Sequence, residues 1–234
     1  MQWRSQVEPT ALTRQGARVI VGVILGTLAY LAWRYTSLPW LLPVHFQRNG
    51  LPDGWQYKTG GRVFLPVFVQ TALAIALGSV AAVLLTRRER ADPDAPDVKA
   101  AATAAEAVVL TAAIWTTFQA YAAVSLVGMW ARERGGLGPS YTVLELVGLV
   151  LTAAVGVRAH VHLGRPAPLP YVAEHWRMGQ LYKNPDHPAL FVPTRDGSRW
   201  TLNFGRPAAA LLLGGILIAG AAVPTIILIL ALRS

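Results

Sequence analysis

The chain alternates long uncharged, apolar runs with shorter polar segments. Three of these runs, residues 63–86, 107–131 and 207–232, contain 24, 25 and 26 residues without a charged side chain. Bilayer hydrocarbon about 30 Å thick is crossed by roughly 20 helical residues. The pattern therefore predicts three membrane-spanning helices.

Two further runs predict two more spans. Only 15 uncharged residues separate Arg18 from Arg34, but arginines at helix ends can extend their charged groups to the lipid headgroups. No small-residue cleavage site follows this run, so we interpret it as a retained span rather than a signal peptide. The other run, about 141–163, carries charges only outside its central part, 146–157. The sequence thus predicts five spans.

Composition agrees with a lipid environment. Hydrophobic residues make up 53% of the chain and charged residues 14%, with a mean hydropathy of +0.40. Soluble domains contain about 25% charged residues. There are no cysteines, which excludes disulfides and thiolate chemistry. In a membrane protein the formal charge of +9 indicates loop charges rather than a nucleic-acid partner.

Those loop charges predict an orientation. The N-terminal tail and the loops on its side of the membrane carry 13 Lys and Arg residues, and the opposite side carries 7. Because basic loops stay in the cytoplasm, we expect the N-terminus inside and the C-terminus outside.

The chain then divides into four parts of an all-α integral membrane protein. Residues 1–86 form a two-helix unit with an outer loop at 35–61, and residues 87–163 form a linker with the third and fourth helices. Residues 164–207 form a cytoplasmic segment, and residues 208–234 form the fifth helix.

The cytoplasmic segment is rich in aromatic residues, which disordered chains lack. Residues 189–193 and 199–204 have the composition of short strands, and the turn between them includes Gly197, which accepts positive φ. We therefore predict a β-hairpin between the fourth and fifth helices. A lone hairpin is marginal in water, so we expect this one to lie against the membrane surface or the helix ends.

Two charged residues lie inside the predicted spans. Glu106 enters the third span from the inside, and Arg158 leaves the fourth span toward the inside. If these antiparallel helices are neighbours, the two residues lie at similar depth and can form an interhelical ion pair. Such a pair can fix helix register or belong to a polar site or ion path.

The sequence contains no persuasive catalytic or metal-binding constellation. His160 and His162 are two residues apart, so on a helix they point about 200° apart and cannot share a metal. His45 with Asp53, and Asp186 with His187, fall short of the three or four ligands of a zinc site. We predict no metal, no cofactor and no enzymatic activity, with a membrane enzyme or metal-binding protein as an alternative.

Small residues on the first predicted span suggest close helix contact. Gly22 and Gly26 are spaced four residues apart, an arrangement that lets helices approach closely within a chain or between chains. An oligomer formed through these two glycines is one consequence of this pattern.

The outer loop carries a motif that resembles a known family. It reads Pro43-Val-His-Phe-x-x-x-Gly50-x-Pro-Asp-Gly-Trp-x-x-Lys58, and it resembles the N-terminal domain of unknown function shared by SdpI-like bacterial membrane proteins. The segment Tyr182-x-Asn-Pro-Asp-x-Pro-Ala-Leu-Phe-Val-Pro193, followed by Trp200-Thr-Leu-Asn-Phe-Gly205, looks like a second small uncharacterised domain at about 176–207. This second domain often accompanies the first.

The resemblance implies a function and a location. The best-known relative gives immunity to a secreted toxic peptide and captures a transcriptional autorepressor at the membrane. By analogy we expect a receptor, immunity or signal-transduction protein of the bacterial inner membrane, with an accessory subunit of a larger membrane complex as the alternative.

We assign binding residues to both polar segments. The outer loop is expected to bind a ligand or membrane partner through His45, Phe46, Asn49, Gly50, Asp53, Trp55 and Lys58. The inner segment is expected to bind a cytoplasmic protein through Trp176, Tyr182, Asn184, Asp186, Phe191, Trp200 and Asn203.

Overall fold

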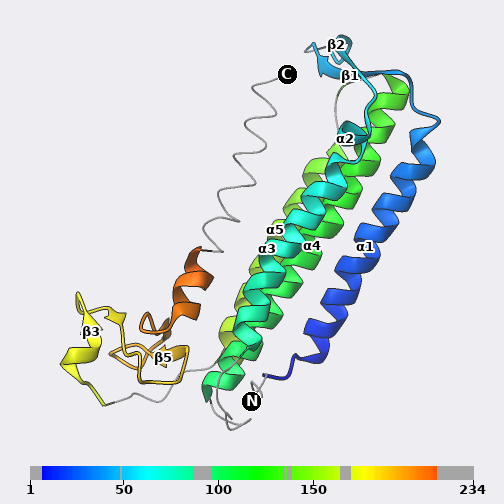
Figure 1. The fold of residues 1–234 in the computed structure, drawn as a ribbon. Coiled ribbons are helices and arrows are strands. Elements are labelled where there is room, and N and C mark those ends of the chain that lie inside the picture. Colours follow the sequence, from blue (N-terminus) through cyan, green and yellow to red (C-terminus); the bar gives the residue numbers. More distant parts are fainter. Residues whose placement is uncertain are drawn as a thin grey trace. The chain divides into compact units, whose positions relative to one another are not determined.

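The computed structural model describes residues 7–47, 49–86, 96–133, 135, 139–163 and 170–214. Most of these residues are helical (Figure 1). The helices are α1 (Ala11–Tyr35), α2 (Gly60–Val63), α3 (Leu65–Leu85), α4 (Pro96–Arg132) and α5 (Pro139–Leu163). Residues 207–214 are also helical, while the remainder of the predicted fifth span lies outside the described residues.

Within the described residues, four helices are long and apolar enough to cross a membrane. They are Ala11–Tyr35, Leu65–Leu85, Val98–Arg132 and Pro139–Leu163. These helices coincide with the first four predicted spans. The short helix α2 precedes α3, and the Thr59 hydroxyl caps it by accepting a hydrogen bond from the Arg62 backbone nitrogen.

Three two-stranded antiparallel sheets connect the helices. They pair β1 (Leu41–Phe46) with β2 (Pro52–Tyr57), β3 (Trp176–Arg177) with β4 (Leu181–Tyr182), and β5 (Phe191–Pro193) with β6 (Trp200–Leu202). The β5–β6 hairpin confirms the hairpin predicted from the sequence, with Gly197 at φ +67° in its turn. The β1–β2 hairpin was not predicted. A single turn of 3₁₀-helix, η1 (Ala173–His175), precedes β3.

The described chain forms two compact units. Among the described residues, one unit contains 7–15, 76–86, 96–110, 154–163 and 170–214, and the other contains 16–47, 49–75, 111–133, 135 and 139–153. Each of the four long helices therefore contributes residues to both units. We call them the first and second unit.

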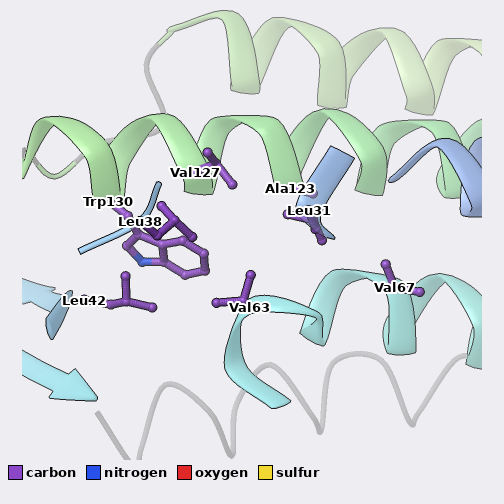
Figure 2. Close-up of a cluster of buried hydrophobic side chains, with 8 residues drawn as sticks. All are labelled: Leu31, Leu38, Leu42, Val63, Val67, Ala123, Val127 and Trp130. Carbon is purple, nitrogen blue, oxygen red and sulfur yellow. The ribbon is translucent and has the colours of Figure 1, made fainter. Parts of the chain in front are cut away.

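The second unit has an apolar core around Trp130 of α4. Figure 2 shows the Trp130 ring close to Leu38, from the segment that leads into β1, with Leu42 of β1 and Val63 of α2 nearby. The core residues are Leu31, Leu38, Leu42, Val63, Val67, Ala123, Val127 and Trp130. Because Leu38 and Leu42 belong to this core, the β1–β2 hairpin is packed onto helix ends. This packing supplies the stability that an isolated hairpin lacks.

A buried polar contact links three helices of the same unit. The Gln70 amide nitrogen on α3 donates to Thr27 Oγ1 on α1 at 3.1 Å and to the Thr116 carbonyl on α4 at 3.0 Å. Gln70 is fully buried. The Gln70 oxygen has no hydrogen-bond partner among the described residues, but an unpaired amide nitrogen here would be costly as well, so the two donated bonds favour one register of α3 against its neighbours.

The Gly22 and Gly26 positions do not show close packing. No described atom beyond their own helix lies within 4 Å of a Cβ built at either glycine. The described part of the chain therefore gives this face no partner helix, and oligomerisation through it stays a prediction.

In the first unit, residues 170–206 form a small module with a core of rings. We call it the hairpin module. Tyr182 is buried, and its ring centre lies 5.3 Å from that of Trp176, 5.8 Å from His175 and 5.9 Å from His187, all at steep angles. Edge-to-face contacts of this kind stabilise aromatic clusters. The buried residues Ala189 and Val192 complete the cluster.

Candidate functional site

The β1–β2 hairpin places two of the predicted binding residues side by side. Its register is irregular, because the pairing skips Val44 on β1 and Asp53 on β2. Such bulges re-aim side chains. Asp53 here turns toward His45, and its Oδ1 contacts the imidazole Nδ1.

Gly54 makes this arrangement possible. It stands opposite His45 in the ladder, and a Cβ at position 54 would lie 2.9 Å from the His45 Cβ. Any larger residue would therefore displace the histidine. The Pro-Asp-Gly triplet at 52–54 supplies both the carboxylate and the space for the ring.

The His45–Asp53 pair is open to solvent. The side chains are 54% and 33% exposed, respectively. Asp53 occupies Nδ1, and no hydrogen bond to Nε2 comes from the described residues. A carboxylate on Nδ1 favours the tautomer in which neutral Nε2 accepts a hydrogen bond. Nε2 can thus accept a hydrogen bond from a ligand. When the ring is protonated, it can instead donate one to a carboxylate.

Lys58, another predicted binding residue, holds the hairpin to α1. Its Nζ donates to the carbonyl oxygens of Tyr35 at 3.0 Å and Leu38 at 2.9 Å, and it lies 4.9 Å from the Tyr35 ring centre. The last carbonyls of a helix have no partner within the helix, and a cation is favoured there. Arg62 of α2 attaches the hairpin to that helix as well, by donating hydrogen bonds to the Tyr57 carbonyl and the Gln56 side-chain oxygen.

The tip of the hairpin is attached to the α4–α5 connection. Gly50, at φ +80°, accepts a hydrogen bond from the Gly135 backbone nitrogen at 2.9 Å. Phe46 lies directly against Gly135, where a Cβ would be 2.6 Å from the ring. The Asn49 side-chain oxygen accepts from the Leu51 nitrogen at 3.0 Å and shapes the turn.

The predicted outer-loop residues therefore fall into two groups. Phe46, Asn49, Gly50 and Lys58 make contacts that shape or anchor the hairpin, whereas His45, Asp53 and Trp55 are exposed. The structure adds exposed apolar side chains that sequence reasoning missed: Trp40, Leu41, Leu51 and Tyr57. Of these, Leu41 and Tyr57 stand directly opposite each other in the β1–β2 ladder, a pairing that no local sequence pattern reveals.

In the hairpin module, Asn203 ties together three segments. It is fully buried, and its Nδ2 donates to the carbonyls of Asn184, His187 and Ala189 at 2.8, 3.1 and 3.2 Å. Its Oδ1 accepts from the backbone nitrogens of Asn184 and Gly205, both at 3.0 Å. The close approach leaves no space at Gly205, where a Cβ would lie 2.4 Å from the Asn184 carbonyl carbon.

The other predicted residues of this segment have different surroundings. Tyr182 is buried in the ring cluster, Trp176 and Phe191 are half-buried, and Asp186 is exposed. Trp200 Nε1 donates to the Leu163 carbonyl at the end of α5, at 3.3 Å. A cleft of about 220 Å³ opens beside the cluster, with Tyr171, His175, Trp176, Tyr182 and Arg195 in its wall.

The β5–β6 turn carries a strongly stabilised carboxylate. Asp196 accepts hydrogen bonds from the Ser198 hydroxyl, the Thr194 hydroxyl and the Ser198 backbone nitrogen. The Ser198 hydroxyl, followed by the Thr194 hydroxyl, holds the pKa of Asp196 well below its usual range. Asp196 is therefore ionised at neutral pH, where its hydrogen bonds stabilise the turn fully.

Glu106 and Arg158 lie side by side in the first unit. Arg158 Nε on α5 is 3.1 Å from Glu106 Oε1 on α4, and the two side chains are 43% and 11% exposed. Thr10, which sequence reasoning missed, donates to the other Glu106 oxygen at 2.5 Å. The carboxylate thus has a partner on each oxygen, which lowers the cost of keeping it buried.

Metal ligation finds no support in the described residues, where no three His, Cys, Asp or Glu side chains gather. His162 Nδ1 lies 2.9 Å from the Arg158 carbonyl of its own helix. His162 and His160 remain exposed at the end of α5.

Comparison with known proteins gives one family match. Residues 22–69 match the model of a domain of unknown function, DUF1648. This match covers 48 of the 234 residues and contains the β1–β2 hairpin, the His45–Asp53 pair and Lys58. No curated protein and no solved structure matches the chain.

Proposed function

We propose that this chain is a non-enzymatic, multi-pass protein of the bacterial inner membrane that binds a partner through its β1–β2 hairpin. The proposal rests on the presence of two groups of residues in the hairpin, one that anchors it and one that remains exposed. Buried residues and Lys58 fix its position on the helix ends, which leaves His45, Asp53 and the neighbouring rings exposed.

The exposed face has the chemistry of a protein-binding surface. Trp40, Trp55 and Tyr57 are 70%, 49% and 65% exposed, and large aromatic residues dominate the energetics of protein interfaces. The His45–Asp53 pair beside them can give such a surface polar specificity. An exported peptide or the outer face of another membrane protein fits this combination, which makes receptor or immunity function the leading hypothesis.

Photocrosslinking in living cells tests the proposal. A benzophenone amino acid at Trp55 or Tyr57 should yield a discrete adduct, and the adduct should disappear in the variants His45→Ala and Asp53→Ala. Thr36→Ala, on the same segment and also exposed, is the matched control and should leave the adduct unchanged. Adducts that are absent, or that persist in both variants, would refute hairpin binding.

The membrane arrangement is part of the proposal and has its own test. Five spans follow from the uncharged apolar runs, and an inside N-terminus with an outside C-terminus follows from the Lys and Arg residues of the loops. Reporter fusions at Met1 and Ser234 should be active on opposite faces of the membrane. Activity on the same face would require a different number of spans.

A second candidate is an accessory subunit of a larger membrane complex. Helix α5 favours it, because nearly all of its apolar side chains are exposed, and Gly148 is its only buried residue among those described. Copurification with other membrane proteins at a fixed stoichiometry would support this candidate over a free receptor.

A further inference from the structure

The hairpin module is held at the level where α5 ends. Trp200 of β6 donates its indole N–H to the Leu163 carbonyl, the last residue of α5. On the other side of the module, an apolar helix begins at Pro207, five residues after β6. If α5 crosses the bilayer, the module lies within a few residues of the lipid headgroups. Trp side chains favour this zone, because their apolar body and N–H donor suit opposite sides of it.

The β3–β4 tip of the module exposes apolar side chains. Met178 is 94% exposed and adopts φ +51°, and Leu181 on β4 is 42% exposed. A turn with positive φ at both central residues favours Asn or Gly at the first of them, and Gly179 follows at φ +71°. Methionine is therefore unfavourable here for both its backbone and its exposure. An apolar partner at the tip would account for it.

Basic side chains surround this tip. Arg177 and Lys183 flank the β3–β4 ribbon, and both are exposed. Arg195 and Arg199 line an open cleft of about 690 Å³ next to Trp176 and Gly179. The module carries five basic and three acidic residues, and the acidic Asp196 in the same cleft is engaged by Ser198 and Thr194. The tip therefore combines an apolar end with a cationic surround.

We propose that the hairpin module docks on the anionic lipid surface of the membrane. Met178 and Leu181 enter the headgroup layer, and Arg177, Lys183, Arg195 and Arg199 face lipid phosphates. An anionic lipid surface fits these observations better than a cytoplasmic protein does, because the Trp200–Leu163 hydrogen bond holds the module beside the end of α5. The inference rests on the proposed membrane location and is independent of partner binding by the β1–β2 hairpin.

A single-cysteine label tests the docking in the full chain. Because the chain contains no cysteine, Met178→Cys carries an environment-sensitive fluorophore without further changes. The protein is placed, one copy per disc, in nanodiscs of phosphatidylcholine with or without phosphatidylglycerol. We expect blue-shifted emission and protection from an aqueous quencher in the anionic discs, with a smaller shift in neutral discs. Added salt should weaken the shift, because it screens surface charges.

Two comparisons make the result specific. Removing one basic residue with Arg177→Gln should weaken docking about fivefold, as expected for one charge near an anionic surface. A label at Asp186→Cys, on the exposed loop after β4, should stay in water. Emission from position 178 that is aqueous in all discs would overturn the proposal and leave the tip for a protein partner. A lipid-independent shift, or an equal shift at position 186, would also overturn it. Failure of the chain to enter nanodiscs would instead count against the membrane location.

Discussion

The Asn203 side chain pairs with the backbone of Asn184 in both directions. Its Oδ1 accepts from the Asn184 nitrogen at 3.0 Å, and its Nδ2 donates to the Asn184 carbonyl at 2.8 Å. One amide group thus takes the place of a neighbouring strand and holds the loop after β4 against β6. In a module too small for a large apolar core, such a network can decide whether the fold forms.

Replacement of Asn203 by Asp should unfold the hairpin module. The change puts an oxygen in place of the Nδ2 that now faces three carbonyls, and burial of the unpaired group should cost more than about 3 kcal/mol. Hydrogen exchange of peptides from residues 182–206, measured in detergent, should rise toward the rate of an unfolded chain.

The matched control for this change is Asn49→Asp. Asn49 is exposed, and its oxygen, which the substitution retains, accepts the Leu51 bond. Hydrogen exchange of residues 182–206 in the Asn49→Asp variant should stay close to that of the unmodified protein. Equal protection of the module in the Asn203 variant would mean that the network does not hold it.

Substitution of Lys58 by Met should loosen the β1–β2 hairpin. The ammonium bonds to the Tyr35 and Leu38 carbonyls would be lost, while most of the side-chain volume would remain. Hydrogen bonds from a charged donor contribute about 1.5–3 kcal/mol, so we expect a loss within that range. Thermal unfolding and exchange of residues 38–58 report it.

A comparison with Lys58→Arg separates charge from geometry. Arginine keeps the charge but carries a planar fork in place of a compact ammonium, so it should restore only part of the stability. If Lys58→Met left both measurements unchanged, Lys58 would have no anchoring role and would return to the group of free binding residues.

Gly135→Ala should strain the contact between the hairpin tip and the α4–α5 connection. The new methyl group would lie 2.6 Å from the Phe46 ring, and overpacking of this kind costs about 1–3 kcal/mol. Truncation of the ring in the double variant Phe46→Ala, Gly135→Ala should recover much of the loss caused by the methyl group.

Gly156→Ala serves as the control for that series. Gly156 lies in α5 with no other group within 4 Å of a built Cβ, so alanine there should be neutral or slightly stabilising. Strict additivity of the Phe46 and Gly135 effects would show that the two residues do not interact.

The long helices were predictable because their signal is local and strong. An uncharged apolar run of sufficient length has few alternatives in lipid, and the four helices found match the first four predicted runs. The β5–β6 hairpin was also predictable, because β-rich residues flank a turn with Gly197 at the position that needs positive φ.

The β1–β2 hairpin was hidden by the same residues that build it. Pro43, Pro52 and Gly54 disfavour regular strands, and the two bulges remove the alternation of exposed and buried positions that reveals a strand. The role of Lys58 was hidden as well, because its partners lie 20 and 23 residues earlier in the chain. No local pattern marks a side chain that caps a distant helix.

The Glu106–Arg158 pair should respond unequally to the loss of each partner. Arg158→Leu would leave a carboxylate that is only 11% exposed with Thr10 as its partner, whereas Glu106→Gln would leave a half-exposed guanidinium that can reach water. We expect a loss of about 2–3 kcal/mol for Arg158→Leu and about 1 kcal/mol or less for Glu106→Gln, measured by thermal unfolding in detergent. The double variant Glu106→Leu, Arg158→Leu removes both charges and should be more stable than Arg158→Leu alone.

The reverse order of the two single variants would mean that the carboxylate is not the buried member that needs compensation. Large losses of function without a change in stability would instead favour a polar site or ion path at this pair.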